Sequence, residues 1–175
     1  MIGFLRFLGV ANAAVWFGAA IFFTFVVGPG FFSEKMIKML GSGNPEVGRV
    51  FAGAAVQLVL ERYFILHQVC GIIAILHVVA EWLYMGKPLQ RLTLWLLLGI
   101  FALGLVGGYG LLPRLQALHR TSHAPGPSTE QREQAKRSFK TLHAVSRVLD
   151  LIVTAGVMVY LWRVTTPSNG YRYKA

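Results

Sequence analysis

Apolar residues are concentrated in four long blocks, and short polar segments separate these blocks. An α-helix rises about 1.5 Å per residue, so about 20 apolar residues are needed to cross the roughly 30 Å hydrocarbon core of a bilayer. Four segments meet this requirement, at about residues 6–27, 63–84, 92–112 and 141–163. The pattern predicts an all-α fold, a four-transmembrane-helix bundle that forms a single integral membrane domain over residues 1–175.

Turn and capping residues mark the ends of the predicted helices. The Gly-Pro-Gly run at 28–30 predicts a break or sharp kink after the first span, because proline lacks an amide donor and clashes with the preceding turn. Residues 33–40 have amphipathic spacing and are predicted to form an interfacial helix. Asn44, followed by proline, predicts the start of a helix that continues to Tyr84, with only its second half in the membrane. The Ser-Thr-Glu-Gln run at 128–131 has capping-box spacing and predicts the start of the last helix.

The segment after the third span is predicted to be polar and largely irregular. Pro113 follows the last apolar residue, and residues 121–127 form a polar stretch with two prolines and a glycine. His119 and His123 are therefore interpreted as solvated residues in or near a loop.

Composition and charge agree with a membrane protein. Hydrophobic residues make up 55% of the chain and charged residues 14%, against roughly 25% charged in an average soluble domain. The net charge of +10 arises from 17 Lys and Arg against 7 Asp and Glu. These basic residues lie between apolar blocks and lack a nucleic-acid-reading module, so nucleic acid is not an expected partner. The single cysteine, Cys70, excludes an internal disulfide and a multi-thiolate metal site.

An even number of spans places both termini on one side of the membrane. The opposite side carries ten Lys or Arg residues, from Lys35 to Lys140. Because basic loops are retained in the cytoplasm, this distribution favours cytoplasmic loops and external termini.

Polar residues within the spans are the candidates for chemistry, because they are costly in lipid and usually face the bundle interior. In the fourth span His143, Ser146, Arg147, Asp150 and Thr154 share one helical face. Arg147 and Asp150 can pair along it, and a structural ion pair is favoured over a proton, ion or cofactor site.

The second span carries another polar face. Cys70, His77 and Glu81 are spaced at i, i+7 and i+11, and His67 lies one turn before Cys70. Glu61 belongs to a polar stripe just before them. The predicted buried polar network comprises Glu61, Glu81, Arg147 and Asp150.

Two cofactor hypotheses follow from the histidines. Haem b in a helical bundle needs one or two histidines from facing helices, and His67 or His77 opposite His143 would supply them. A copper site would use Cys70 and His77 as ligands. The spacing is not specific to either group, so the favoured expectation is that no cofactor is bound.

The third span carries a packing signal rather than a catalytic one. Gly104 and Gly108 form a small-xxx-small pair, which predicts close helix packing. The sequence has no nucleophile–base triad, paired acid–base carboxylates or zinc-protease motif, so an enzyme is not favoured.

Two runs, LPRLQALH at 112–119 and FKTLHAVS at 139–146, carry a resemblance to a known family. Together with Asn12, Trp16 and Thr24 they resemble the bacterial relatives of transmembrane protein 205, a small four-helix membrane domain of unknown function. The resemblance covers about residues 4–163 and implies the four-helix fold without implying a reaction. This fold is similar to that of copper-resistance and haem-associated membrane proteins.

The chain departs from that family at two positions. Ala144 stands where the family tends to have glycine, and Asp150 where it tends to have asparagine.

These observations favour a small polytopic protein of a bacterial inner membrane that acts as a non-enzymatic accessory or interaction subunit. Its expected partners are the lipid bilayer and another membrane protein or a second copy of the chain. The alternatives are a haem b- or copper-binding redox protein and a small transporter or proton pathway.

Overall fold

The computed structural model describes residues 2–85, 89–124 and 126–166, and within these ranges it contains helices and connecting turns but no strand. The elements are α1 (Ile2–Phe22), π-helical η1 (Phe23–Val27), α2 (Gly28–Phe31), α3 (Glu34–Leu40), α4 (Pro45–Met85), α5 (Arg91–Leu105), π-helical η2 (Val106–Leu111), α6 (Leu112–His123) and α7 (Thr129–Thr165).

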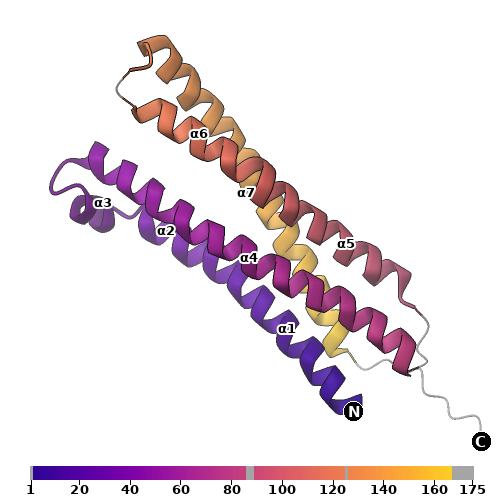
Figure 1. The fold of residues 1–175 in the computed structure, drawn as a ribbon. Helices are drawn as coiled ribbons and strands as arrows, with labels where there is room; N and C mark the ends of the chain where they lie inside the picture. The colour runs from indigo at the N-terminus through magenta and orange to yellow at the C-terminus, as the bar shows by residue number, and fades with distance from the viewer. Residues whose placement is uncertain (1, 86–88, 125, 167–175) are drawn as a thin grey trace, which may run out of the picture.

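Four continuous helical runs are long and apolar enough to cross a membrane, which confirms the predicted fold class. They cover Gly3–Phe31, Pro45–Tyr84, Arg91–His123 and Thr129–Thr165. Helix α1 packs against α4 and α7, and α5 packs against α4 and α7, so the four runs form a bundle. Figure 1 shows α3 and the α6–α7 turn at one end of this bundle, with the start of α1 and the last turns of α7 at the other.

The helices continue through both prolines, so the loop predicted after Pro113 is wrong, and of the break or kink predicted at residues 28–30 the break does not occur. In each case a π-helical segment ends directly before the proline-containing helix. The Gly28 amide bonds to the Phe23 carbonyl, and the Leu112 amide bonds to the Gly107 carbonyl, five residues back in both cases. The wider turn moves the preceding carbonyl away from the proline ring. It also changes the hydrogen-bond pairing so that the amide hydrogen that proline lacks is not needed at this point. His119 and His123 therefore lie on α6.

The predicted helix starts are confirmed by their capping bonds. Asn44 Oδ1 accepts hydrogen bonds from the amides of Glu46 and Val47 at 3.0 and 3.4 Å. Ser128 and Gln131 form a complete capping box, with bonds of 2.9 and 3.2 Å. From these caps α4 runs for 41 residues and α7 for 37. At about 1.5 Å per residue α4 is about 60 Å long, roughly twice the hydrocarbon thickness of a bilayer.

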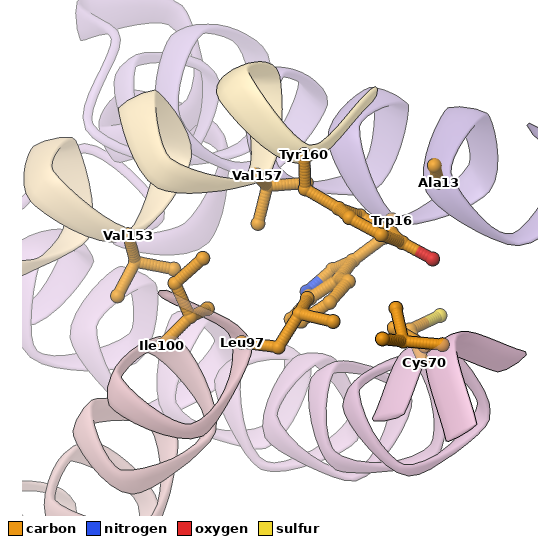
Figure 2. Packing of buried hydrophobic residues seen from close by; sticks show 10 residues of the cluster. Ala13, Trp16, Cys70, Leu97, Ile100, Val153, Val157 and Tyr160 are labelled. Carbon is orange, nitrogen blue, oxygen red and sulfur yellow. The ribbon is translucent and has the colours of Figure 1, made fainter. Parts of the chain in front are cut away.

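The buried core lies in the half of the bundle where α1, α4, α5 and α7 are all present. Trp16, Leu97, Val157 and Tyr160 are fully buried there, and Figure 2 shows them converging with Cys70 of α4. Their large side chains fill the centre, while alanines and glycines let the helix backbones approach closely.

Gly104 and its neighbours have the predicted packing role. A Cβ atom added at Gly104 would overlap the His67 ring, and one added at Gly107 or Gly108 would press on Phe64. The α5–η2 glycines therefore accept aromatic and imidazole side chains from α4.

Gly104→Ala is expected to destabilise the bundle, although alanine is the better helix former by about 1 kcal/mol. The added methyl group overlaps His67, and overpacking of this kind costs about 1–3 kcal/mol. Gly99→Ala on the same helix is the matched control, because its Cβ would meet no atom within 4 Å. Equal unfolding free energies for the two variants in detergent would contradict this account of Gly104.

Candidate functional site

The centre of the bundle holds a hydrogen-bonded pair, Trp16 and His67, that links three helices. Trp16 Nε1 donates to His67 Nδ1 at 2.9 Å, and His67 Nε2 lies 3.3 Å from the Ile100 carbonyl oxygen. An indole nitrogen can only donate, so Nδ1 is the acceptor and the ring proton is on Nε2, which donates to Ile100. Both side chains are almost fully buried. The pair ties α1, α4 and α5 together with one fixed histidine tautomer.

Two further polar side chains tie α1 to α4. Asn12 Nδ2 donates to the Cys70 carbonyl oxygen at 3.0 Å, one helical turn from Trp16. Closer to the N-terminus, His77 Nε2 donates to the Leu5 carbonyl oxygen at 3.0 Å. Gly9 lies against this ring, because a Cβ atom at Gly9 would overlap the imidazole. Asn12 and His77 therefore both hold α1 against α4.

A third polar contact joins the π-helical segment η1 to α7. Thr24 Oγ1 donates to Asp150 Oδ2 at 2.6 Å. A bond this short to a carboxylate is a strong one, and it lies within the membrane-spanning part of the bundle. Because Thr24 belongs to η1, the wide turn that precedes Pro29 also presents this donor to α7.

Aromatic rings connect these contacts into one row. Tyr63 stacks on Phe23, with ring centroids 4.7 Å apart, and its centroid lies 6.2 Å from that of His67. Trp16 continues the row to Tyr160 at 6.4 Å. The row explains why the polar groups are held in single positions, since each ring is packed between others.

Some buried polar atoms on or near this row have no hydrogen-bond partner within the described part of the chain. They include Tyr63 Oη, His77 Nδ1, Thr154 Oγ1 and Tyr160 Oη. Buried groups of this kind are commonly bonded to ordered water.

The four residues of the predicted polar network differ in burial. Glu61 and Arg147 are exposed, whereas Glu81 and Asp150 are partly buried. Glu61 Oε1 accepts a 2.8 Å bond from Gln116 Nε2 on α6, away from Asp150. Arg147 is exposed, and Asp150 accepts its hydrogen bond from Thr24 on another helical run.

The histidines predicted as cofactor ligands lie in three different environments. His67 uses both ring nitrogens in hydrogen bonds, and His77 uses one. His143 is exposed and stacks on Phe139, with centroids 5.8 Å apart and rings within 8° of parallel. Cys70 and His77, the predicted copper ligands, are two turns apart on α4.

The geometry gives no support to the haem or copper hypotheses. A ligand at His67 would have to break a bond to Trp16 or to Ile100. Within the described ranges, no group of three or more His, Cys, Asp or Glu side chains is placed to hold a metal ion.

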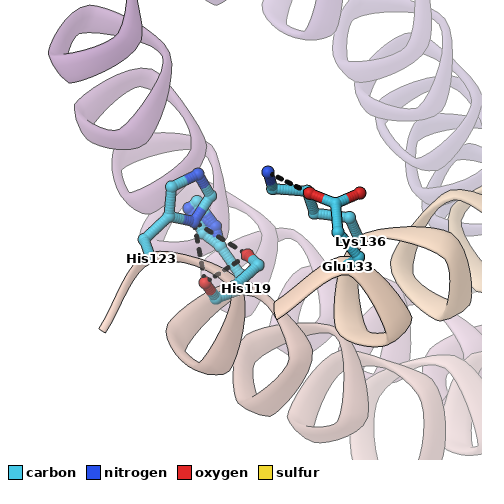
Figure 3. A network of polar contacts seen from close by, with 5 residues as sticks. His119, His123, Glu133 and Lys136 are labelled. Atoms are coloured by element: carbon cyan, nitrogen blue, oxygen red, sulfur yellow. Dashed lines mark hydrogen bonds and ion pairs between the residues drawn. The ribbon is translucent and has the colours of Figure 1, made fainter. Parts of the chain in front are cut away.

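A serine–histidine contact occurs at the end of α6, and it caps the helix. Ser122 Oγ donates to the His119 carbonyl oxygen at 2.8 Å. His123 Nδ1 lies 2.8 Å from Ser122 Oγ and 2.9 Å from the same carbonyl, as Figure 3 shows for the two histidines. The hydroxyl proton goes to the backbone and not to the imidazole, so the serine is not activated as a nucleophile.

Several contacts that position the helices were missed by sequence reasoning, among them three that join two side chains. They are Trp16–His67, Thr24–Asp150 and the 2.8 Å bond from Arg163 Nη1 to Thr93 Oγ1. Each joins residues at least 51 positions apart, so spacing along one helix carries no signal of the pairing. The polar residues of the first span, Asn12 and Thr24, were the available clue, because a polar residue in a span needs a partner on another helix.

The fold and these contacts define a four-helix integral membrane protein whose interior polar groups bind helices to one another. The chain belongs to the family described as a domain of unknown function, DUF4149, which matches residues 12–124. No curated protein and no solved structure matches the chain. The matched region contains Trp16, His67 and Gly104, whereas α7 lies beyond it.

Trp16→Phe is expected to lower the unfolding free energy by about 1–3 kcal/mol, because His67 Nδ1 would remain buried without its donor. Trp162→Phe is the matched control, since Trp162 is 70% exposed. Denaturant titration in detergent micelles would measure both. If the two variants lose equal stability, the buried bond does not contribute as described.

Thr24→Val is expected to cost about 1–3 kcal/mol, because the part-buried Asp150 Oδ2 would lose its donor. Arg147→Ala is expected to change stability by less than about 0.5 kcal/mol, because Arg147 is exposed. The same titration compares the two variants. A larger loss for Arg147→Ala would show that an Arg147–Asp150 pair stabilises the fold after all.

Proposed function

We propose that this chain is a non-enzymatic accessory or interaction subunit of a bacterial inner membrane, and that one face of α7 binds another membrane protein. The resemblance to the bacterial relatives of transmembrane protein 205 is also part of this proposal, because the family that matches the chain has no assigned function.

The use of the interior polar groups supports a non-enzymatic role. Asn12, Trp16 and His67 donate to or accept from another helix of the same chain. Side chains committed to holding helices in place are poorly available to a substrate. The Ser122–His123 contact is likewise directed at the backbone.

The observation that carries the proposal is the polar face that α7 turns outward within the fourth span. His143 and Arg147 are both exposed there, although they lie in a helix that is apolar enough to cross the membrane. Arginine costs about 2.5–3.5 kcal/mol at the centre of a membrane helix on insertion scales and less toward the end of a span, where Arg147 lies. A partner helix that offers a carboxylate at this depth would offset this cost. Stacking on Phe139 keeps His143 in one position beside the arginine.

Site-specific photo-crosslinking tests this face. A crosslinker at Ala144, which is exposed and one turn from Arg147, is expected to capture a discrete membrane protein in native membranes. The crosslinked band should weaken at least tenfold with Arg147→Gln and return with Arg147→Lys, because the attraction requires a positive charge. A crosslinker at Trp95, which is 70% exposed on α5, is the control for nonspecific capture.

Two results would contradict the proposal. The first is equal capture at both positions, or capture that does not depend on the charge at residue 147. The second is a reducible haem spectrum or stoichiometric copper in protein purified gently from its native membrane, which would favour the redox alternative instead. A band at twice the mass of the chain would identify the partner as a second copy.

A further inference from the structure

The hairpin formed by α6 and the first half of α7 contains a continuous groove. Two adjoining hollows, of about 430 and 380 Å³, lie between the two helices. Leu118 and Ser138 line both hollows, so they are parts of one depression, called here the hairpin groove. Both hollows are shallow and open on one side rather than enclosed.

The two halves of the hairpin groove differ in chemistry. The larger hollow is lined mainly by apolar side chains, among them Ala117, Leu142 and Val145. The smaller hollow adds the neutral polar side chains of Thr121, Gln131 and Gln134. The groove is therefore apolar at one end and rich in hydrogen-bonding groups at the other, as an amphiphile requires.

The apolar end of the hairpin groove is the end that lies nearer the hydrocarbon layer of the membrane. The apolar stretch of the third span ends near residue 112, and that of the fourth span begins near residue 141. The larger hollow, between Arg114 on α6 and Val145 on α7, therefore lies at the edge of the hydrocarbon layer. The smaller hollow lies farther out. From Val145 to Gln131 the groove follows α7 for 14 residues, or about 21 Å.

Positive charge lies where the apolar half meets the headgroup layer. Arg114 lines the larger hollow, and Arg137 is exposed on α7 next to Ser138 of the groove wall. Glu133, an acidic residue of the same hairpin, is paired with Lys136 at 2.8 Å, as Figure 3 shows. The carboxylate is thereby directed to a lysine of its own helix. An anionic headgroup would meet a surface with a net positive charge.

We propose that the hairpin groove is a binding site for one anionic phospholipid. An acyl chain lies along Leu142 and Val145 at the membrane end of the groove, the phosphate lies at Arg114, and the rest of the headgroup reaches past Ala117 toward Thr121 and Gln131. Basic sites between membrane helices bind anionic lipid headgroups in this manner, and each Lys or Arg near the surface adds about a fivefold gain in affinity. This site is separate from the His143–Arg147 face and does not depend on the function proposed for it.

Native mass spectrometry of the full chain tests the site, with titration of phosphatidylglycerol or phosphatidylcholine into the detergent-solubilised protein. We expect one retained phosphatidylglycerol, bound at least fivefold more tightly than phosphatidylcholine. Arg114→Gln should remove this preference. Ala117→Phe should fill the apolar hollow and reduce retention of both lipids about tenfold. Both residues are exposed, so neither change disturbs the buried core.

Matched controls separate the site from general surface charge and bulk. Arg120→Gln removes an exposed arginine from α6 outside the groove lining, and Ala155→Phe enlarges an exposed alanine of α7 outside it. Both should retain the lipid like the parent chain. Equal loss in the Arg114 and Arg120 variants, or unchanged retention with Ala117→Phe, would overturn the proposal. Displacement of the lipid by inorganic phosphate alone would also overturn it, because the acyl hollow would then be irrelevant.

Discussion

Inside a bilayer there is no water to hydrogen-bond a polar side chain, so each such group must find its partner in the protein. This constraint explains the interior of the bundle better than any functional motif does. Trp16, which can only donate, meets a histidine nitrogen that can only accept, and the other nitrogen of that histidine reaches a backbone carbonyl on a third helix. Asn12 on α1 and Thr24 on η1 repeat the pattern toward α4 and α7. The polar groups thereby specify which helices are neighbours, while apolar contacts with little directional preference fill the space between them.

The same constraint governs the backbone at the two prolines. A proline within a membrane helix removes a donor where water cannot replace it. In both cases a π-helical segment precedes the proline, and in η1 the altered turn also carries Thr24 toward Asp150. A backbone adjustment and a helix–helix contact are thus provided by one short segment.

Much of the fold follows from the sequence because it depends on local properties. The lengths of the apolar blocks predicted the four spans, and the capping residues Asn44 and Ser128 predicted where two helices begin. Gly104 predicted a point of close helix packing. The continuation of the helix through Pro113 could not be predicted from the sequence, because a π-helical turn has no clear sequence signal. The partner of Asp150 did not follow either. Periodicity along a helix suggests Arg147, three residues away, whereas the actual donor is 126 residues away on another helix.

The fixed tautomer of His67 has a consequence for the movement of protons through the bundle. An ionisable side chain in the middle of a bilayer is a place where protons can leak, because imidazole can take a proton at one nitrogen and release another. Here the nitrogen that would accept is bonded to an indole N–H, which does not exchange roles as a hydroxyl or a water molecule does. The chain of bonds from Trp16 through His67 to the Ile100 carbonyl therefore ends in groups that do not pass a proton on.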